Sequence, residues 1–161
     1  MILQIVGYKN SGKTTLMTYA VEILKSHGMR VATIKHHGGK DKGHSDIALQ
    51  TNTVDHMRHF NAGADQSIVQ GYHFQQTVTR YENQRLDEII AKSVTIDNDI
   101  VIVEGFKEAK YSKVVVYRDD IDYKYLSELS NIKYDINIEQ PLAMQKFEQW
   151  LLSFVNVKGM D

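Results

Sequence analysis

The chain has 161 residues, 42% of them hydrophobic, so a single domain with its own buried core over residues 1–161 is expected. Its 19 Lys and Arg residues against 20 Asp and Glu give a net charge of -1, which argues against a broad nucleic-acid surface. The absence of cysteine excludes disulfides and thiolate metal sites and makes the cytoplasm the default location, and no apolar run reaches membrane-spanning length.

The first part of the chain alternates between a strand, a loop and a helix. Residues 2–6, ILQIV, form a short apolar run that predicts a buried parallel strand. From Lys13 the apolar residues fall on one helical face, and Gly28 stands where a left-handed cap would end the helix. Residues 30–35 predict a second strand, and a long polar, glycine-rich loop is expected after it.

The same alternation continues to the end of the chain. Helices are expected at residues 55–60, 85–92 and 143–154, with a helical or irregular stretch at 122–129. Strands are expected at 66–70, with a candidate hairpin partner at 75–82, and at 99–105, 113–118 and 131–139. This order predicts an α/β fold, a mainly parallel β-sheet flanked by helices on both faces, with 99–105 and 113–118 near its centre.

Residues 7–14, GYKNSGKT, match the phosphate-binding pattern G-x-x-x-x-G-K-[ST]. In this pattern the backbone N–H groups surround a phosphate, Lys13 reaches the terminal phosphates and the Thr14 hydroxyl ligates Mg²⁺. A glycine-containing turn capped by Thr14 is the alternative. The position between a predicted strand and a predicted helix is the context that the motif requires, and it favours a phosphate loop.

A carboxylate is expected near the magnesium, and Glu104 provides one at the end of the apolar run IVIVEG. Asp99 precedes this run and would lie at the opposite end of the strand, where we expect a solvated or capping role. Glu104 is therefore the predicted magnesium ligand, or the ligand of a water bound to it.

Six of the seven histidines fall between residues 36 and 73, and three interpretations stay open. The first is a transition-metal site completed by Asp46 and Asp55, and the second is a solvated polar loop. The third is recognition of an anionic ligand near the nucleotide edge of the sheet, preferred here over a metal site. The basic residues that support this third interpretation are Lys35, His36, His37, Lys40, Lys42, Arg58 and His59.

No catalytic base can be assigned from the residues. Asp46 and Asp55 could each approach the magnesium or a catalytic water, with surface solvation as the alternative for Asp46. Asp55 is the candidate retained, although it begins a predicted helix, where capping is a competing role.

The segments GYKNSGKTTL, TIKHH, DHMRHFNAGAD and DIVIVEGFK followed by KVVVYRD together resemble the molybdopterin-guanine dinucleotide biosynthesis protein B family, from residue 2 to about residue 120. This resemblance implies a P-loop nucleoside triphosphate hydrolase fold that binds GTP with Mg²⁺ and forms a homodimer. It also implies an adapter, a weak GTPase, that assists the molybdenum cofactor guanylyltransferase. That partner converts molybdopterin to molybdopterin guanine dinucleotide.

Residue by residue, the resemblance assigns the phosphate loop to Asn10, Ser11, Gly12, Lys13, Thr14 and Thr15. It places residues 104–107 on the EGFK element, with Lys107 facing a pterin phosphate or the partner, and it matches Asp55 to an aspartate before AGA. The chain reads NTVDHM where many members carry a Gly-Lys-Asp-Ser run. The segment NIKYD also differs by one residue from the guanine-reading N-K-x-D pattern, so the GTP expectation follows from the resemblance.

Two other functions use the same loop. A small-molecule kinase would transfer the γ-phosphoryl group to an acceptor, but no arginine-bearing lid is recognisable among Arg80, Arg85 and Arg118. A nickel- or zinc-delivery GTPase would give the histidine cluster a role.

Overall fold

The computed structural model describes residues 1–37, 47–82 and 84–156. The chain divides into two compact units, one formed by residues 1–38 with 90–161 and the other by residues 39–89. That the whole chain acts as one domain stays a prediction.

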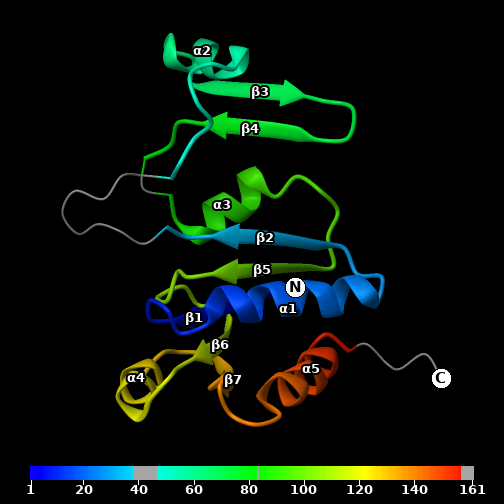
Figure 1. Ribbon diagram of the computed structural model, residues 1–161, viewed down its shortest axis with the longest axis vertical. Helices are drawn as coiled ribbons and strands as arrows, with labels where there is room; N and C mark the ends of the chain where they lie inside the picture. The colour runs from blue at the N-terminus through cyan, green and yellow to red at the C-terminus, as the bar shows by residue number, and fades with distance from the viewer. Residues whose placement is uncertain (38–46, 83, 157–161) are drawn as a thin grey trace. The chain divides into compact units, whose positions relative to one another are not determined.

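The first unit contains a five-stranded, fully parallel sheet with the strand order β2-β5-β1-β6-β7 (Figure 1). The predicted parallel sheet is thereby confirmed, with β1 at its centre and β5 and β6 directly beside it. Because parallel strands end at the same edge, residues that follow them meet there. The strands are β1 Ile2–Gly7, β2 Val31–Lys35, β5 Ile100–Glu104, β6 Ser112–Val116 and β7 Ile132–Ile136.

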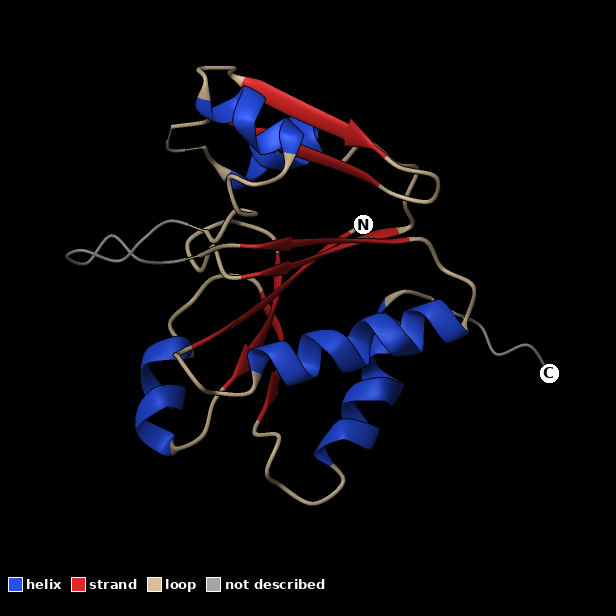
Figure 2. Cartoon of the chain, turned by 45° about the horizontal axis from the view of Figure 1, so that its top comes forward, coloured by secondary structure: helices blue, strands red, loops and turns tan. Residues whose placement is uncertain are grey.

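Helices cover both faces of this sheet, as predicted. Helix α1 (Lys13–Ser26) and helix α5 (Ala143–Phe154) pack next to each other on one face (Figure 2). Helix α4 (Asp120–Leu126) places Leu126 on the other face, against Val6 and Val115. Alternate residues of each strand point to opposite faces, so both cores draw on the same short apolar runs. The larger core is formed mainly by Leu3, Ile5, Leu16, Ala20, Leu24, Ile102, Val114, Phe147 and Leu151.

The far end of α1 and the start of β2 fix the edge of the sheet opposite the phosphate loop. Gly28 adopts the predicted left-handed conformation, with φ 74°. The Arg30 backbone N–H donates to Asp99 Oδ2 at 2.7 Å, so Asp99 ties the start of β2 to the start of β5. Asp99 therefore lies at the end of β5 opposite the phosphate loop, as expected, and Glu104 lies at the loop end of the same strand.

The second unit consists of helix α2 (Asp55–Asn61) and a two-stranded antiparallel sheet, β3 (Gln66–Gln70) and β4 (Gln75–Thr79). The candidate hairpin is thus confirmed, and it forms a sheet of its own. Arg80 joins the hairpin to α2, because its guanidinium lies 4.1 Å from the centre of the Phe60 ring and donates to the Phe60 carbonyl at 2.9 Å.

Helix α3 (Leu86–Ser93) spans the boundary between the two units. No helix in the described ranges combines the length and apolarity needed to cross a membrane.

Candidate functional site

The segment GYKNSGKT connects the end of β1 to the start of α1, and its backbone requires small or permissive residues. A Cβ on Gly7 would lie 2.3 Å from the Val116 carbonyl oxygen, so only glycine fits between β1 and β6. Asn10 and Gly12 have φ of 61° and 93°, in the left-handed region that asparagine and glycine tolerate best. The Ser11 N–H donates to the Tyr8 carbonyl at 3.3 Å, which closes the turn.

Helix α1 begins at Lys13 with a free, positive end. Gly12 is its N-cap residue, no side chain caps it, and no acidic residue lies in its first turn. The first N–H groups of a helix have no acceptor within the helix, and the helix dipole favours an anion beside them. The loop and helix therefore have the geometry of an anion-binding site, and phosphate binding there stays a prediction.

Glu104 lies next to this helix end because β5 is the direct neighbour of β1. Its side chain is 10% exposed, and it accepts a hydrogen bond from the Thr14 hydroxyl at 3.4 Å (Oγ1 to Oε2). Lys35 pairs with Glu104 in the β2–β5 register, and its Nζ lies 3.4 Å from Oε1. One pocket collects the predicted groups; its lining is Lys9, Asn10, Gly12, Lys13, Thr14, Thr15, Lys35 and Glu104.

The Thr14 hydroxyl and the Glu104 carboxylate fit the donor set expected for Mg²⁺. Magnesium prefers oxygen ligands at about 2.1 Å in octahedral geometry, so two neighbouring ligands lie about 3 Å apart. The observed separation of 3.4 Å between Thr14 Oγ1 and Glu104 Oε2 is close to that value. These two oxygens would hold the ion from the protein side, and phosphate oxygens and water would complete its shell.

Lys13 lies in a positively charged and partly dehydrated environment. Burial lowers its pKa below the ordinary value of 10.5, because a charged ammonium loses hydration there. Glu104 opposes this effect on the pKa, and three neighbouring cations add to it, Lys107, Lys35 and Arg118. A bound phosphate would favour the charged form of Lys13 and relieve the repulsion among these cations.

The EGFK element is held against the phosphate loop by specific contacts. Gly105 and Phe106 both have positive φ, 100° and 53°. The Gln4 side-chain amide donates to both of their carbonyls, at 3.0 Å and 2.7 Å, and the His36 ring stacks on Phe106 with centroids 4.2 Å apart. The Lys107 ammonium then lies 3.9 Å from the centre of the Tyr8 ring, so the predicted second element reaches the first.

Other predicted site residues are placed elsewhere or are not described. Asp55 and Arg58 belong to the second unit, where they form an ion pair with each other at 3.8 Å, and a role for either at the phosphate loop stays a prediction. His37 is exposed at the end of β2. Lys40, Lys42, His44 and Asp46 lie outside the described residues. Within the described ranges, no three His, Asp or Glu side chains gather in an arrangement that could hold a metal.

Three residues of this region were not recognised from the sequence. Gln4 is the one polar residue of the run ILQIV and is fully buried, which was a signal for a specific partner. Tyr8 carries the Lys107 contact. Ile138 packs closely on the phosphate loop, and a Cβ on Gly12 would lie 2.2 Å from Ile138 Cδ1. No local sequence pattern predicts that contact.

Comparisons with known proteins bear on most of the chain. A sequence profile of the family described as molybdopterin guanine dinucleotide synthesis protein B, MobB, matches residues 2–134. A probable molybdopterin-guanine dinucleotide biosynthesis adapter protein of Bacillus subtilis is 34% identical over 131 residues, which is 81% of this chain and 73% of that protein. A Haemophilus influenzae adapter protein of the same description is 27% identical over 146 residues, 90% of this chain and 78% of that protein.

The fold has a solved counterpart. The crystal structure of a MobB protein homolog from Bacillus stearothermophilus superposes with a TM-score of 0.72 at 31% identity. The likeness covers 98% of this chain and 99% of that one. The predicted α/β fold of the P-loop class is confirmed by this agreement over nearly the whole length.

Proposed function

Since the chain belongs to the MobB family, we propose that it is a GTP-binding adapter that assists the conversion of molybdopterin to molybdopterin guanine dinucleotide. One contact supports the nucleotide-binding part of this proposal most directly. GYKNSGKT and EGFK are far apart in the chain, yet Thr14 Oγ1 and Glu104 Oε2 lie 3.4 Å apart. A phosphate loop with a carboxylate beside its threonine is the arrangement that a magnesium-bound nucleoside triphosphate requires.

The geometry of the site supports a role for each group. The N–H groups of residues 10–15 and the Lys13 ammonium would bind the phosphates, and Thr14 and Glu104 would hold Mg²⁺. Among the described residues, the pocket lining contains one carboxylate, Glu104, and it is already engaged by Thr14 and Lys35. No further base lies in the described part of that lining to activate a water molecule. This supports a weak, Mg²⁺-dependent GTPase that acts mainly as an adapter.

The partners in this proposal are the molybdenum cofactor guanylyltransferase and molybdopterin or its guanine dinucleotide, in the cytoplasm. Lys107 and the exposed groups at the end of β2, Lys35, His36 and His37, supply positive charge and hydrogen-bond donors beside the phosphate pocket. Such groups suit a phosphorylated pterin or an acidic surface of the partner.

A homodimer is also part of the proposal. The hairpin of the second unit exposes large apolar side chains, with Ile68, Tyr72 and Phe74 at 56%, 95% and 83% exposure. Large apolar side chains with this degree of exposure are often found at protein contact surfaces. The unpaired edges of the hairpin would favour association with a second copy.

Replacing Lys13 tests the nucleotide site. Lys13→Ala should weaken binding of GTP with Mg²⁺ by about tenfold to a hundredfold in calorimetry, because charge-assisted hydrogen bonds to phosphate are lost. Lys25→Ala, at the other end of the same helix and outside the pocket, is the matched control and should bind like the unmodified protein. Equal affinity in Lys13→Ala and the control would disprove the assigned phosphate site.

The pathway role is tested separately. Deleting the gene in its host should lower the activity of an enzyme that needs the guanine dinucleotide form of the cofactor, most clearly when molybdate is limiting. Re-expression of the unmodified chain should restore that activity. Full activity in the deletion strain would contradict the adapter role and leave the nucleotide-binding proposal intact.

A further inference from the structure

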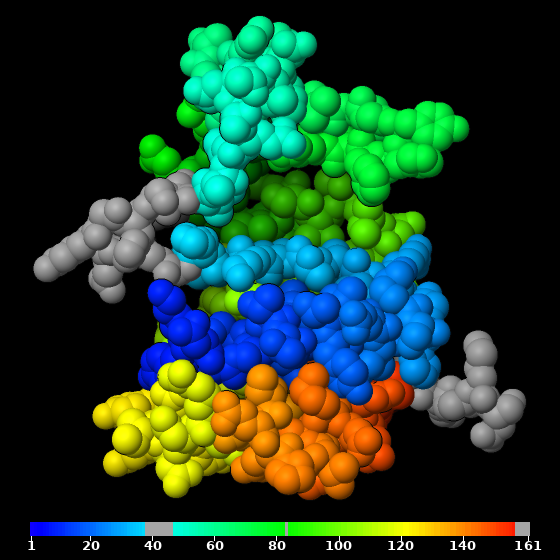
Figure 3. Space-filling view, in the orientation of Figure 1, coloured from blue at the N-terminus to red at the C-terminus, as the bar shows by residue number. Residues whose placement is uncertain are grey.

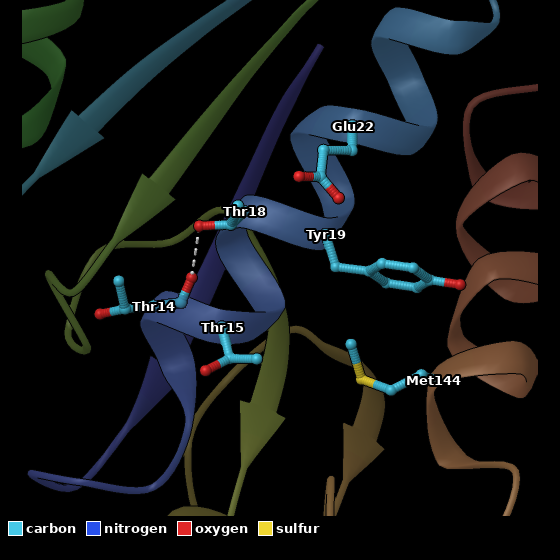
Figure 4. A pocket seen from close by; sticks show the side chains of 6 residues that line it. All are labelled: Thr14, Thr15, Thr18, Tyr19, Glu22 and Met144. Atoms are coloured by element: carbon cyan, nitrogen blue, oxygen red, sulfur yellow. Dashed lines mark hydrogen bonds between the residues drawn. The ribbon is translucent and has the colours of Figure 1, made fainter.

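A second pocket adjoins the phosphate pocket along the exposed side of α1 (Figure 4). The two pockets share Thr14 and Thr15, so one ligand can occupy both. The second pocket continues over the next two turns of α1 and is bounded on its other side by the first turn of α5. Figure 3 shows the surfaces of α1, in blue, and α5, in orange, meeting on this face. The lining is Thr14, Thr15, Thr18, Tyr19, Glu22 and Met144.

The middle of this pocket offers apolar surface suited to a flat ring. Tyr19 and Met144 approach each other across it from α1 and α5 (Figure 4). The Tyr19 hydroxyl donates to Glu148 Oε2 at 2.6 Å, so the ring is held in a fixed orientation between the two helices. A rigid aromatic ring and a polarisable thioether both pack well against heteroaromatic ligands.

The far end of the pocket has one free polar group. The Thr18 hydroxyl donates to the Thr14 carbonyl at 3.0 Å, and the Tyr19 hydroxyl is occupied by Glu148. Glu22 is exposed, and among the described residues it has neither an ion-pair nor a hydrogen-bond partner. It lies seven residues beyond Thr15, a rise of about 10.5 Å along the helix, which is comparable to the reach of a ribose and a purine.

We infer that this pocket takes the guanine base of the nucleotide whose phosphates occupy the loop, with Glu22 as the residue that selects guanine. The inference rests on the proposed phosphate site. A carboxylate can only accept hydrogen bonds. Guanine presents two adjacent donors, the ring N1–H and the 2-amino group, whereas adenine presents a ring nitrogen acceptor beside its amino group. Glu22 therefore favours guanine over adenine through two hydrogen bonds, with the ring lying against Tyr19 and Met144.

The same 2-amino-4-oxo ring edge occurs in a pterin, so the base could come from either source. Guanine is favoured because Thr14 and Thr15 belong to both pockets, which suits a base joined through ribose to phosphates in the loop. A free pterin would leave that continuity unexplained.

Removing the Glu22 charge tests the selection. Calorimetric titration of GTP, ITP and ATP, each with Mg²⁺, should show affinity falling in that order, because inosine lacks the 2-amino group. Glu22→Gln should lower GTP affinity by about tenfold to a hundredfold and leave ATP affinity nearly unchanged. Glu128→Gln removes an exposed carboxylate outside both pockets and is the matched control. Met144→Ala should weaken all three nucleotides by a similar factor, because packing on the ring does not depend on its edge.

The outcomes separate this inference from the proposed function. If Lys13→Ala loses GTP but Glu22→Gln keeps the same ratio of GTP to ATP affinity, the base pocket is wrong and the phosphate site stands. If Glu22→Gln loses affinity only for free pterin, titrated alone, the pocket belongs to a pterin and the guanine assignment is overturned. If the unmodified protein binds neither GTP nor ATP, the proposed function fails and the inference with it.

Discussion

The Thr14 hydroxyl donates to the Glu104 carboxylate at 3.4 Å although 90 residues separate them in the chain. The contact exists because β1 and β5 are parallel neighbours, which brings the start of α1 and the end of β5 to one edge of the sheet. Two oxygens meet at the point where the phosphate loop begins its helix. This relationship predicts how nucleotide binding depends on magnesium.

Glu104→Gln should remove most of the increase in GTP affinity that Mg²⁺ produces, because a neutral amide oxygen is a weaker magnesium ligand than a carboxylate. Affinity measured with EDTA should change little or rise slightly, since a negative charge beside the phosphates is lost. Calorimetric titrations with and without Mg²⁺ give both values.

Asp99→Asn is the matched control for this change, since Asp99 precedes β5 at the opposite end of the strand and contacts Arg30. It should leave the magnesium effect intact. A magnesium effect of equal size in Glu104→Gln and the unmodified protein would rule Glu104 out as a ligand of the ion or of its bound water.

Gly12→Ala should weaken both the fold and nucleotide binding. Its φ of 93° costs an alanine about 1 to 2 kcal/mol, and the new Cβ would lie 2.2 Å from Ile138 Cδ1. Ile138 can move only by loosening its packing on the phosphate loop. Urea unfolding and GTP titration measure the two effects.

Gly28→Ala is the control that separates the cost of a left-handed backbone conformation from an effect on the nucleotide site. Gly28 has a similar φ of 74°, but nothing lies within 4 Å of its Cβ position, and it stands at the far end of α1. It should lose about 1 to 2 kcal/mol of stability while keeping GTP affinity. If Gly28→Ala weakened GTP binding as much as Gly12→Ala does, general destabilisation would explain both, and the close packing at Gly12 would have no special role.

Local sequence patterns were sufficient for the elements and for the phosphate loop. Short β-branched apolar runs such as residues 100–103 indicate buried strands. The glycines and Lys13 of GYKNSGKT lie within eight residues of each other. Strand order is a long-range property and has no such local sign. The ion pair between Lys35 and Glu104 depends on β2 being next to β5, so neither residue alone indicated it.

The contacts that hold the EGFK element were also beyond local reasoning. Gln4 donates to carbonyls about one hundred residues away, at Gly105 and Phe106, and Tyr8 contacts Lys107, which is similarly distant in the chain. The hairpin of β3 and β4 was recognisable from its two short runs. That it forms a separate sheet follows from tertiary contacts within the second unit, including Arg80 on Phe60.

Gln4→Leu should release the start of the EGFK element. The substitution leaves the carbonyls of Gly105 and Phe106 without their donor, which costs about 1 to 3 kcal/mol. A role in positioning Glu104 can be recognised by comparing GTP affinity with and without Mg²⁺. GTP affinity measured in EDTA should be kept. The increase in GTP affinity on adding Mg²⁺ should become smaller, because Glu104 directly precedes the released loop. Gln4→Met, which is similar in size and has no hydrogen-bond donor, should behave like Gln4→Leu. A normal magnesium gain in both variants would limit Gln4 to a structural role.

Lys113 contacts the other end of the segment that joins β5 to β6, residues 105–111. Its burial makes the stability of the protein depend on pH. It is fully buried beside Gln4 in the β1–β6 register, and its ammonium donates to the carbonyls of Ala109, Tyr111 and Ser130. Burial lowers the pKa of Lys113 below the ordinary 10.5, with Glu108 opposing the effect. Lys113→Met should cost about 1 to 3 kcal/mol near pH 7, because those carbonyls lose their donor.

The sign of the pH effect follows from proton binding. Between the lowered pKa of Lys113 and 10.5, the unfolded chain binds more protons at this lysine than the folded one does, so stability rises with pH in that window. Lys113→Met removes this contribution, and the stability gap between the unmodified protein and the variant should therefore widen as pH rises toward 10.5. Trp150, the single tryptophan, stacks on Tyr134 at 4.8 Å and reports unfolding by fluorescence. A gap that stays constant or narrows over this window would show that the Lys113 ammonium is not held in the folded state at a lowered pKa.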